Sequence, residues 1–145
     1  MFLSMFTESK NKKLVKKWKK EHEQLVVLGR KVIADYVENN KDRLRKSLKD
    51  FTHEAVEHLN SEDIEFYRLM RDPDRSDKLI LEQIQKFNDS FKGVKETLVK
   101  FLAKYNREET PLDEEFFEGF SKIMEVLEQR IDFEEHELYF TLSLS

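Results

Sequence analysis

The sequence predicts an all-α protein, an up-down-up-down antiparallel four-helix bundle. Apolar residues recur at three- and four-residue steps through four long segments, which is the period of an amphipathic helix. The 145 residues include only three glycines and two prolines, and 39% of them are charged. This composition suits long helices with a solvent-facing side. Short polar stretches join the segments, and short connections make consecutive helices antiparallel neighbours.

The predicted bundle forms a single domain over residues 1–145, with helices over about 8–38, 42–70, 77–105 and 111–142. Asp42 is suited to cap the second helix. Pro73 cannot continue a helix and therefore separates the second from the third. Thr110 followed by Pro111 is a suitable cap and first residue for the fourth. The inward stripe of the first helix ends at Tyr36, and that of the fourth begins at Phe117.

Polar side chains interrupt the apolar stripes near the middle of three predicted helices. They are His22 on the first helix, His58 and Glu62 on the second and Glu134 on the fourth. His58 and Glu62 are four residues apart, so they lie one above the other on the same helix face. Buried groups of this kind cost several kcal/mol when they have no partners. Either a metal ion or an ion-pair partner must therefore satisfy them.

Composition excludes several other functions. The net charge of −4 does not favour nucleic acid, and no apolar run is long enough to span a bilayer. The chain has no cysteine, which fits a reducing cytoplasm. The apolar stretch 1–6 is too short for a signal peptide, and we expect it to be an arm packed on the bundle or on a neighbour. The sequence contains no nucleophile–base pair or phosphate loop, so we do not expect an enzyme.

The two halves of the chain are similar in sequence pattern and can be aligned, which we call the internal echo. Their alignment pairs His22 with Asn88, His58 with Arg130, Glu62 with Glu134 and Tyr67 with Tyr139. Together with the bundle pattern, these residues resemble the hemerythrin-like (HHE cation-binding) family over about residues 14–142. The family pattern is a histidine on the first helix and His-x-x-x-Glu on the second, repeated on the third and fourth.

The resemblance implies a non-haem di-iron centre inside the bundle. Imidazoles hold such a centre and two carboxylates bridge it, and it binds oxygen or senses oxygen, nitric oxide or iron. This sequence keeps four of the family's positions, namely His22, His58, Glu62 and Glu134. It departs from the family at Asn88 and Arg130. Arginine keeps its proton in proteins, so Arg130 cannot be a metal ligand.

The residues leave three hypotheses open. In the first, the four retained positions hold one iron, manganese or zinc ion. In the second, no metal binds and Arg130 pairs with both Glu62 and Glu134, while His22, His58 and Asn88 complete a hydrogen-bonded core network. The third is a complete di-iron centre. The sequence slightly favours the metal-free core, because arginine is the usual residue for buried ion pairs.

The functional prediction is a binding, sensory or regulatory role instead of standard oxygen carriage. The alternative is an iron-binding protein with one or two ions that binds or senses oxygen or nitric oxide. A peroxidase-like or nitric-oxide-reducing activity would need a metal with an open position. The expected partners are a small gas ligand and a second copy or a regulatory protein, with no nucleic acid and no membrane. The composition suits a cytoplasmic bacterial protein.

Overall fold

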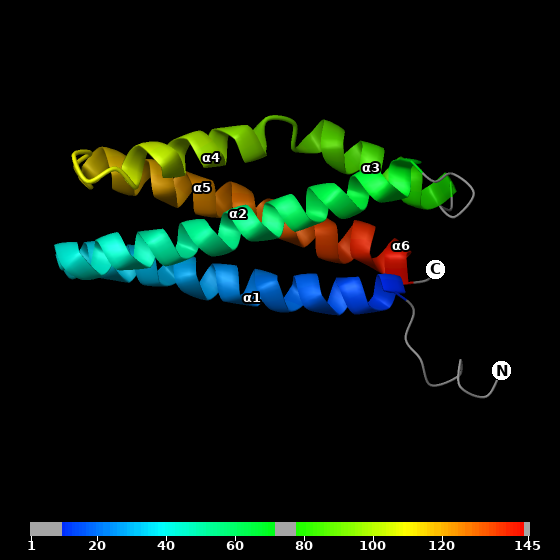
Figure 1. The fold of residues 1–145 in the computed structure, drawn as a ribbon, viewed down its shortest axis with the longest axis horizontal. Helices are drawn as coiled ribbons and strands as arrows, with labels where there is room; N and C mark the ends of the chain where they lie inside the picture. Colours follow the sequence, from blue (N-terminus) through cyan, green and yellow to red (C-terminus); the bar gives the residue numbers. More distant parts are fainter. Residues whose placement is uncertain (1–9, 72–77, 144–145) are drawn as a thin grey trace.

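The computed structural model describes residues 10–71 and 78–143, and in these ranges the only regular structure is helical. The helices form four long segments, called legs below, which run roughly parallel to one another in Figure 1. Their elements are α1 (Lys10–Val37), α2 (Lys41–Arg71), α3 (Lys78–Ser90), α4 (Val94–Tyr105), α5 (Glu114–Phe133), the π-helical turn η2 (Glu134–Leu138) and α6 (Tyr139–Ser143). The third leg consists of α3 and α4, and the fourth runs through α5, η2 and α6. The predicted all-α bundle is confirmed.

Each leg contacts two others along its length. α1 packs on α2 and on the fourth leg, through α5 and α6. α2 also packs on α3 and α4, and the third leg packs on the fourth. Consecutive legs therefore surround one central core. No helix in the described ranges has the length and hydropathy needed to cross a membrane.

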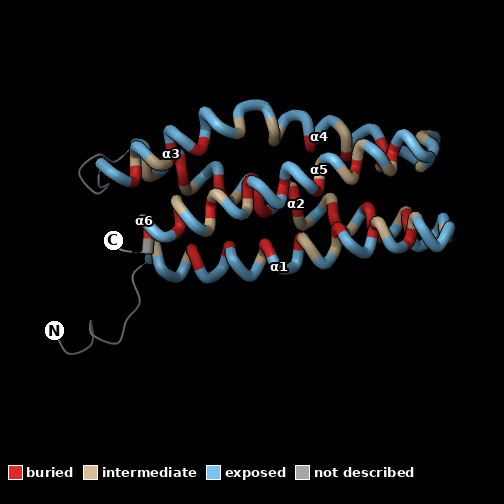
Figure 2. The backbone as a smooth tube through the Cα atoms, turned by 180° about the vertical axis from the view of Figure 1, so that it is seen from behind, coloured by how far each residue is buried: buried red, intermediate tan, exposed pale blue. Residues whose placement is uncertain are grey.

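The core is formed by the inward stripe of each leg, which Figure 2 shows as a line of buried positions. The buried apolar residues form two clusters. One contains Leu25, Phe51 and Phe120, and the other contains Trp18 and Tyr139. His22 comes between Trp18 and Leu25 in α1, so the polar residues of the predicted site lie where the two apolar clusters meet.

The third leg differs from the predicted helix over 77–105, because it is interrupted between α3 and α4. Gly93 adopts a left-handed backbone conformation with φ of 80°. Left-handed residues cannot continue a right-handed helix, and glycine adopts this conformation without the steric cost of a Cβ atom. The hydrophobic stripe continues across the interruption, so apolar periodicity alone did not reveal it.

The second helix begins one residue earlier than predicted and has a different cap. The Asn40 side chain accepts a hydrogen bond from the Arg43 N–H at 3.1 Å. Asn40 therefore caps α2, and the prediction of Asp42 as the cap is wrong. Asparagine satisfies a free N–H of the first turn as well as aspartate does.

The fourth helix begins later than the predicted residue 111. Asp113 has extended backbone geometry, and its carboxylate accepts a hydrogen bond from the Phe116 N–H at 3.1 Å. Asp113 is thus the cap, while Thr110 and Pro111 lie in the preceding loop. A carboxylate at this position also interacts favourably with the positive end of the helix dipole.

Two aromatic residues predicted to face inward lie instead at the rim of the bundle. Tyr36 and Phe117 are half-buried, and their rings stack with centroids 4.5 Å apart. Their neighbours Asp35 and Phe116 are the buried residues at these points. The expected arm over 1–6 and the break at Pro73 lie outside the described residues.

We expect Gly93→Ala to lower the free energy of unfolding by about 1–2 kcal/mol, because the new Cβ would be strained in the left-handed region. A Cβ at this position would meet no atom within 4 Å, so the loss would come from the backbone and not from a clash. Gly93→Asn should cost less, since asparagine tolerates this conformation. Urea denaturation measures both variants, and unchanged stability of Gly93→Ala would contradict the prediction.

Candidate metal centre

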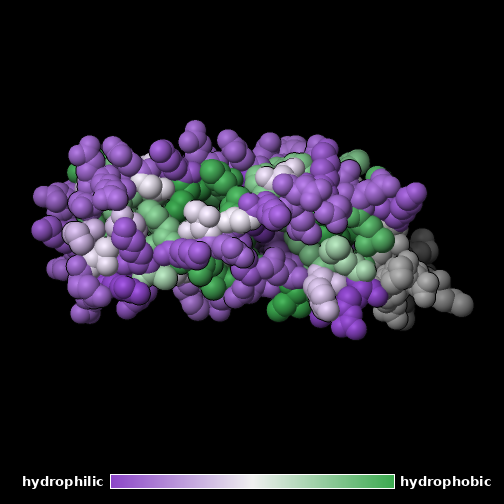
Figure 3. Space-filling model, turned by 90° about the horizontal axis from the view of Figure 1, so that it is seen from above, coloured by the Kyte–Doolittle hydropathy of each residue, from purple (hydrophilic) through white to green (hydrophobic). Residues whose placement is uncertain are grey.

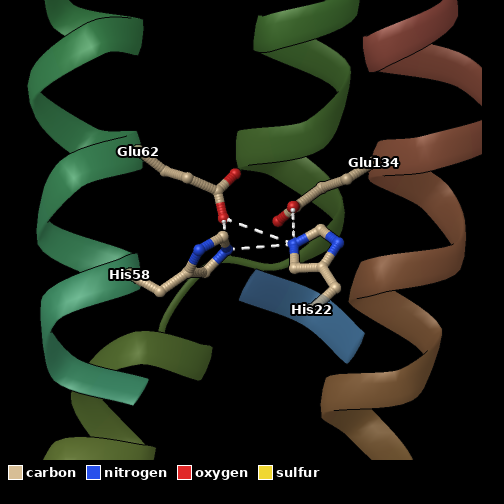
Figure 4. Close-up of side chains that lie close together, drawn as sticks. All are labelled: His22, His58, Glu62 and Glu134. Atoms are coloured by element: carbon tan, nitrogen blue, oxygen red, sulfur yellow. Dashed lines mark hydrogen bonds and ion pairs between the residues drawn. The ribbon is translucent and has the colours of Figure 1, made fainter. Parts of the chain in front are cut away.

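Four polar side chains from three legs converge in the middle of the bundle (Figure 4). They are His22 from α1, His58 and Glu62 from α2 and Glu134, the first residue of η2. All four are buried, and one ligating atom from each lies within 4.8 Å of the other three. The structure therefore brings together all four side chains that the sequence marked as candidate ligands.

The contacts in this cluster centre on His22. Its Nε2 atom lies 2.9 Å from His58 Nε2, 3.1 Å from Glu134 Oε2 and 3.8 Å from Glu62 Oε1. Glu62 Oε1 also contacts His58 Nε2. Four atoms that carry lone pairs thus face one small volume.

A carboxylate outside the cluster orients one of the imidazoles. Glu21 Oε1 lies 2.7 Å from His58 Nδ1, so that nitrogen donates its proton to Glu21. When His58 is neutral, its Nε2 lone pair then points to His22 and Glu62. Metal-binding histidines are commonly fixed by this kind of contact. His22 Nδ1 makes no hydrogen bond among the described residues, and Glu135 Oε1 is 3.8 Å away.

Tyr139 belongs to the apolar cluster that contains Trp18, and its hydroxyl group contacts three of the four candidate ligands from that side. Its hydroxyl oxygen lies 2.6 Å from Glu134 Oε2, 3.1 Å from Glu62 Oε2 and 3.3 Å from His22 Nε2. The single hydroxyl proton is donated to one carboxylate at a time. The Tyr139 ring lies 5.4 Å from the Trp18 ring, which holds the phenol in place.

The π-helical turn explains how Tyr139 reaches this position. The Tyr139 N–H donates to the Glu134 carbonyl, a bond that spans five residues instead of four. Tyr139 therefore lies over Glu134, and both side chains face inward. Tyr67, its counterpart in the internal echo, lies in a regular α-helix and is 62% exposed.

Arg130 is buried one turn before Glu134, and its Nε donates to Glu134 Oε1 at 2.9 Å. Its Cζ atom lies 4.7 Å from the centroid of the Phe87 ring. Within the described residues Arg130 makes no hydrogen bond to Glu62, on which it acts only through its charge. The predicted double pairing is therefore found for one carboxylate and not for the other.

Asn88 does not join the core network, and this part of the prediction is wrong. It is exposed at the end of α3, whereas the preceding residue, Phe87, is buried. Adjacent residues on an α-helix point in directions about 100° apart. Since Phe87 occupies the inward position, the Asn88 side chain is turned away from His22.

The carboxylates favour protonation of both imidazoles. Burial disfavours the charged form of His22, but its contacts with Glu134 and Glu62 outweigh this effect and raise the pKa to about 9. Burial likewise opposes the charge on His58, whose pKa is raised by its hydrogen bond to Glu62 and by the charge of that carboxylate. Without a metal ion, the cluster therefore retains protons that a metal ion would displace.

The acidic groups respond differently to the same burial. Burial raises the pKa of Glu62, but contacts with His22 and His58 prevail and hold it below the ordinary value. Burial and the charge of Glu62 together raise the pKa of Glu134. Burial, followed by the two nearby carboxylates, raises the pKa of Tyr139 well above that of a free phenol. The phenol thus remains a hydrogen-bond donor.

The donor set fits one divalent cation. Two imidazole nitrogens and two carboxylates suit iron, manganese or zinc. Once the imidazoles release their protons, the four donor atoms lie within 4.8 Å of one another with their lone pairs available, an arrangement that a cation would stabilise. The fold and this site define a helical bundle with a buried cluster that could hold a metal ion.

The family model for the hemerythrin HHE cation-binding domain matches residues 13–142. The chain therefore belongs to the hemerythrin HHE cation-binding family, as the resemblance predicted. No curated protein and no solved structure matches the chain significantly.

Sequence reasoning missed two residues that contact the ligand cluster, Glu21 and Tyr139. Glu21 precedes His22 on the flank of α1, in a lysine-rich stretch where a polar residue suggests a solvated surface. Tyr139 was noted only as the counterpart of Tyr67. Its position beside a histidine predicted to be buried could have identified Glu21. Metal-binding histidines commonly donate their other ring N–H to a carboxylate.

We expect the metal-free protein to lose stability as the pH rises from 6.5 to about 9. In this window folded His22 retains a proton that the unfolded chain releases, so the free energy of unfolding falls with pH. A loss of the order of 1–3 kcal/mol is expected for one group shifted this far. Urea denaturation at several pH values measures it. His22→Gln should remove most of the slope, and equal slopes in both proteins would contradict the assignment.

Proposed function

We propose that this protein binds a single iron ion through His22, His58, Glu62 and Glu134 and acts as a binding or sensory protein for a small gaseous ligand. The observation that carries the proposal is the orientation of His58 by Glu21, at 2.7 Å. This contact directs the second imidazole nitrogen to the point where the other three donors meet. Iron is the metal typical of the family to which the chain belongs.

The proposal of one ion instead of two rests on the residues at the family's other histidine positions. Arg130 is a permanent cation, and its Nε is bound to Glu134. Its charge opposes a second metal ion at that place. Asn88 is exposed at the end of α3 and supplies no donor to the cluster. The donors found together therefore suit one ion.

Bound iron would supply coordination positions beyond the four protein ligands, at which a molecule such as oxygen or nitric oxide could bind. The chain's own residues prepare the site for this. Glu21 fixes the imidazole of His58, Arg130 holds one oxygen of Glu134, and the phenol of Tyr139 bonds to the carboxylates. The apolar clusters on both sides exclude bulk water.

A binding or sensory role fits the enclosure of the site better than catalysis on a larger substrate. The side chains of the four candidate ligands are between 0% and 3% exposed. Only very small molecules can reach such a centre without rearrangement of the bundle. A sensory protein would pass on the binding event through its surface, to a second copy or to a regulatory protein.

A second candidate is a regulatory bundle without metal, and the Arg130–Glu134 ion pair favours it. In that case the protonated imidazoles and Arg130 would neutralise the two buried carboxylates. Removing Arg130 would then deprive the buried Glu134 Oε1 of its charged donor, at a cost of about 3–5 kcal/mol. The two candidates differ directly in metal content.

We expect about one iron per chain in protein prepared with iron supplementation, by elemental analysis combined with visible spectra before and after exposure to air. His58→Ala should abolish uptake, because it removes one of two imidazole donors. His53→Ala is the matched control, an exposed histidine on the same helix, and should retain the iron. Two irons per chain would contradict the single-ion site. A folded protein with no metal would favour the metal-free bundle.

We expect Glu21→Ala to weaken the metal affinity about 10–100-fold, the usual effect of removing a carboxylate that orients a metal-binding histidine. Glu23→Ala is the control, an exposed glutamate two residues further on in α1, and should leave the affinity unchanged. Competition with a chelator of known affinity measures both. Equal affinities in the two variants would refute the orienting role of Glu21.

A further inference from the structure

The interruption of the third leg opens a pocket of about 210 Å³ beside the polar core. The end of α3, the turn at Gly93 and the first turn of α4 line it, together with Asp63 from α2 and Arg130 from α5. None of the four candidate metal ligands lines it. Figure 3 views this side of the molecule and shows apolar side chains at the surface in the middle of a mostly polar face.

The guanidinium end of Arg130 is the unusual feature of this pocket. The residue is only 4% exposed, and its Nε is used by Glu134. Across residues 10–71 and 78–143, its two Nη atoms form no hydrogen bond with the protein. Those atoms carry four of the five guanidinium N–H groups. These N–H groups are not buried within the protein but open onto the pocket, so they are available to an acceptor that enters it.

The charges around the pocket favour an anion. Lys95 is paired with Asp63, so these two charges cancel. Lys92 is exposed and forms no ion pair with the described residues. Glu96 is the other carboxylate on the wall and lies in the first turn of α4. Three cations, Lys92, Lys95 and Arg130, and two carboxylates thus line the wall, so its charged residues sum to one positive charge. Glu134, which shares the charge of Arg130, does not line the pocket.

The N-terminus of α4 adds backbone donors to the same pocket. Its cap residue is Gly93, which has no side chain to bond the first-turn N–H groups. The Val94 N–H donates to the Phe91 carbonyl, so the N–H groups of Lys95 and Glu96 are the donors that remain. Free N–H groups and the helix dipole make such a terminus attractive to anions. The terminus, the unused end of Arg130 and Lys92 thus line the same small volume.

We propose that this pocket binds a small planar oxyanion, of which formate and nitrate are the simplest examples. The Nη1–Nη2 edge of Arg130 presents parallel N–H groups that match two oxygens of a planar anion. Lys92 and the first turn of α4 complement its charge, and the Asn88 amide on the wall can donate a further hydrogen bond. The inference does not depend on the proposed iron site, because it concerns residues that hold no metal.

The test is a nuclear magnetic resonance titration of the full-length, metal-free protein with sodium formate and with sodium nitrate, at ionic strength held constant by sodium chloride. We expect saturable shifts of the Arg130 Nε–H and of the amides at Gly93 to Glu96. Sulfate, which is tetrahedral, should give weaker shifts. Shifts that are absent, do not saturate or are as large with sulfate would overturn the proposal.

Variants make the test specific to the pocket. Arg130→Lys should abolish saturable binding, because lysine lacks the planar pair of donors. Lys92→Gln is the second variant and does not depend on the buried core. It should weaken binding about two- to fivefold, as expected for one exposed charge. Lys100→Gln, an exposed lysine of α4 outside the pocket, should have no effect. Equal weakening by the two lysine variants would reduce the binding to general electrostatic attraction and contradict the proposal.

Discussion

The centre of this protein depends on the burial of two carboxylates, Glu62 and Glu134, which are 0% and 1% exposed. An unpaired charge in such surroundings costs several kcal/mol, a large part of the stability of a small domain. Two imidazoles, a guanidinium and a phenol surround these carboxylates and compensate them. The apolar clusters at both ends seal the group from water. A cation placed among the same donors would serve the same purpose.

Two local departures from the regular α-helix shape this centre. The π-helical turn at Glu134–Leu138 brings Tyr139 over Glu134 and so adds the phenol to the carboxylates. The turn at Gly93 ends α3 and opens the pocket onto which Arg130 faces. π-Helical turns are frequent at functional sites. Here the regular part of the bundle positions the ligands, and the irregular turns determine what lies next to them.

The helical period was enough to predict the bundle and the burial of the four candidate ligands, because hydrophobic packing makes residues at three- and four-residue steps share a face. The helical period failed to predict the structure where the backbone is not a regular α-helix. Tyr139 depends on a five-residue hydrogen bond, and the break at Gly93 leaves the apolar stripe intact. It also failed for Asn88, since Phe87 takes the inward position. Glu21 was missed because a flanking polar residue is usually solvated.

The most direct test of the central claim is anomalous diffraction at the iron edge from crystals of the iron-loaded protein. A single iron peak bounded by His22, His58, Glu62 and Glu134, with Arg130 still bound to Glu134, is the result we predict. Two iron peaks, or a peak that displaces Arg130, would show that the arginine does not limit the site to one ion. The absence of any peak among these residues in a well-ordered crystal would contradict the metal site itself.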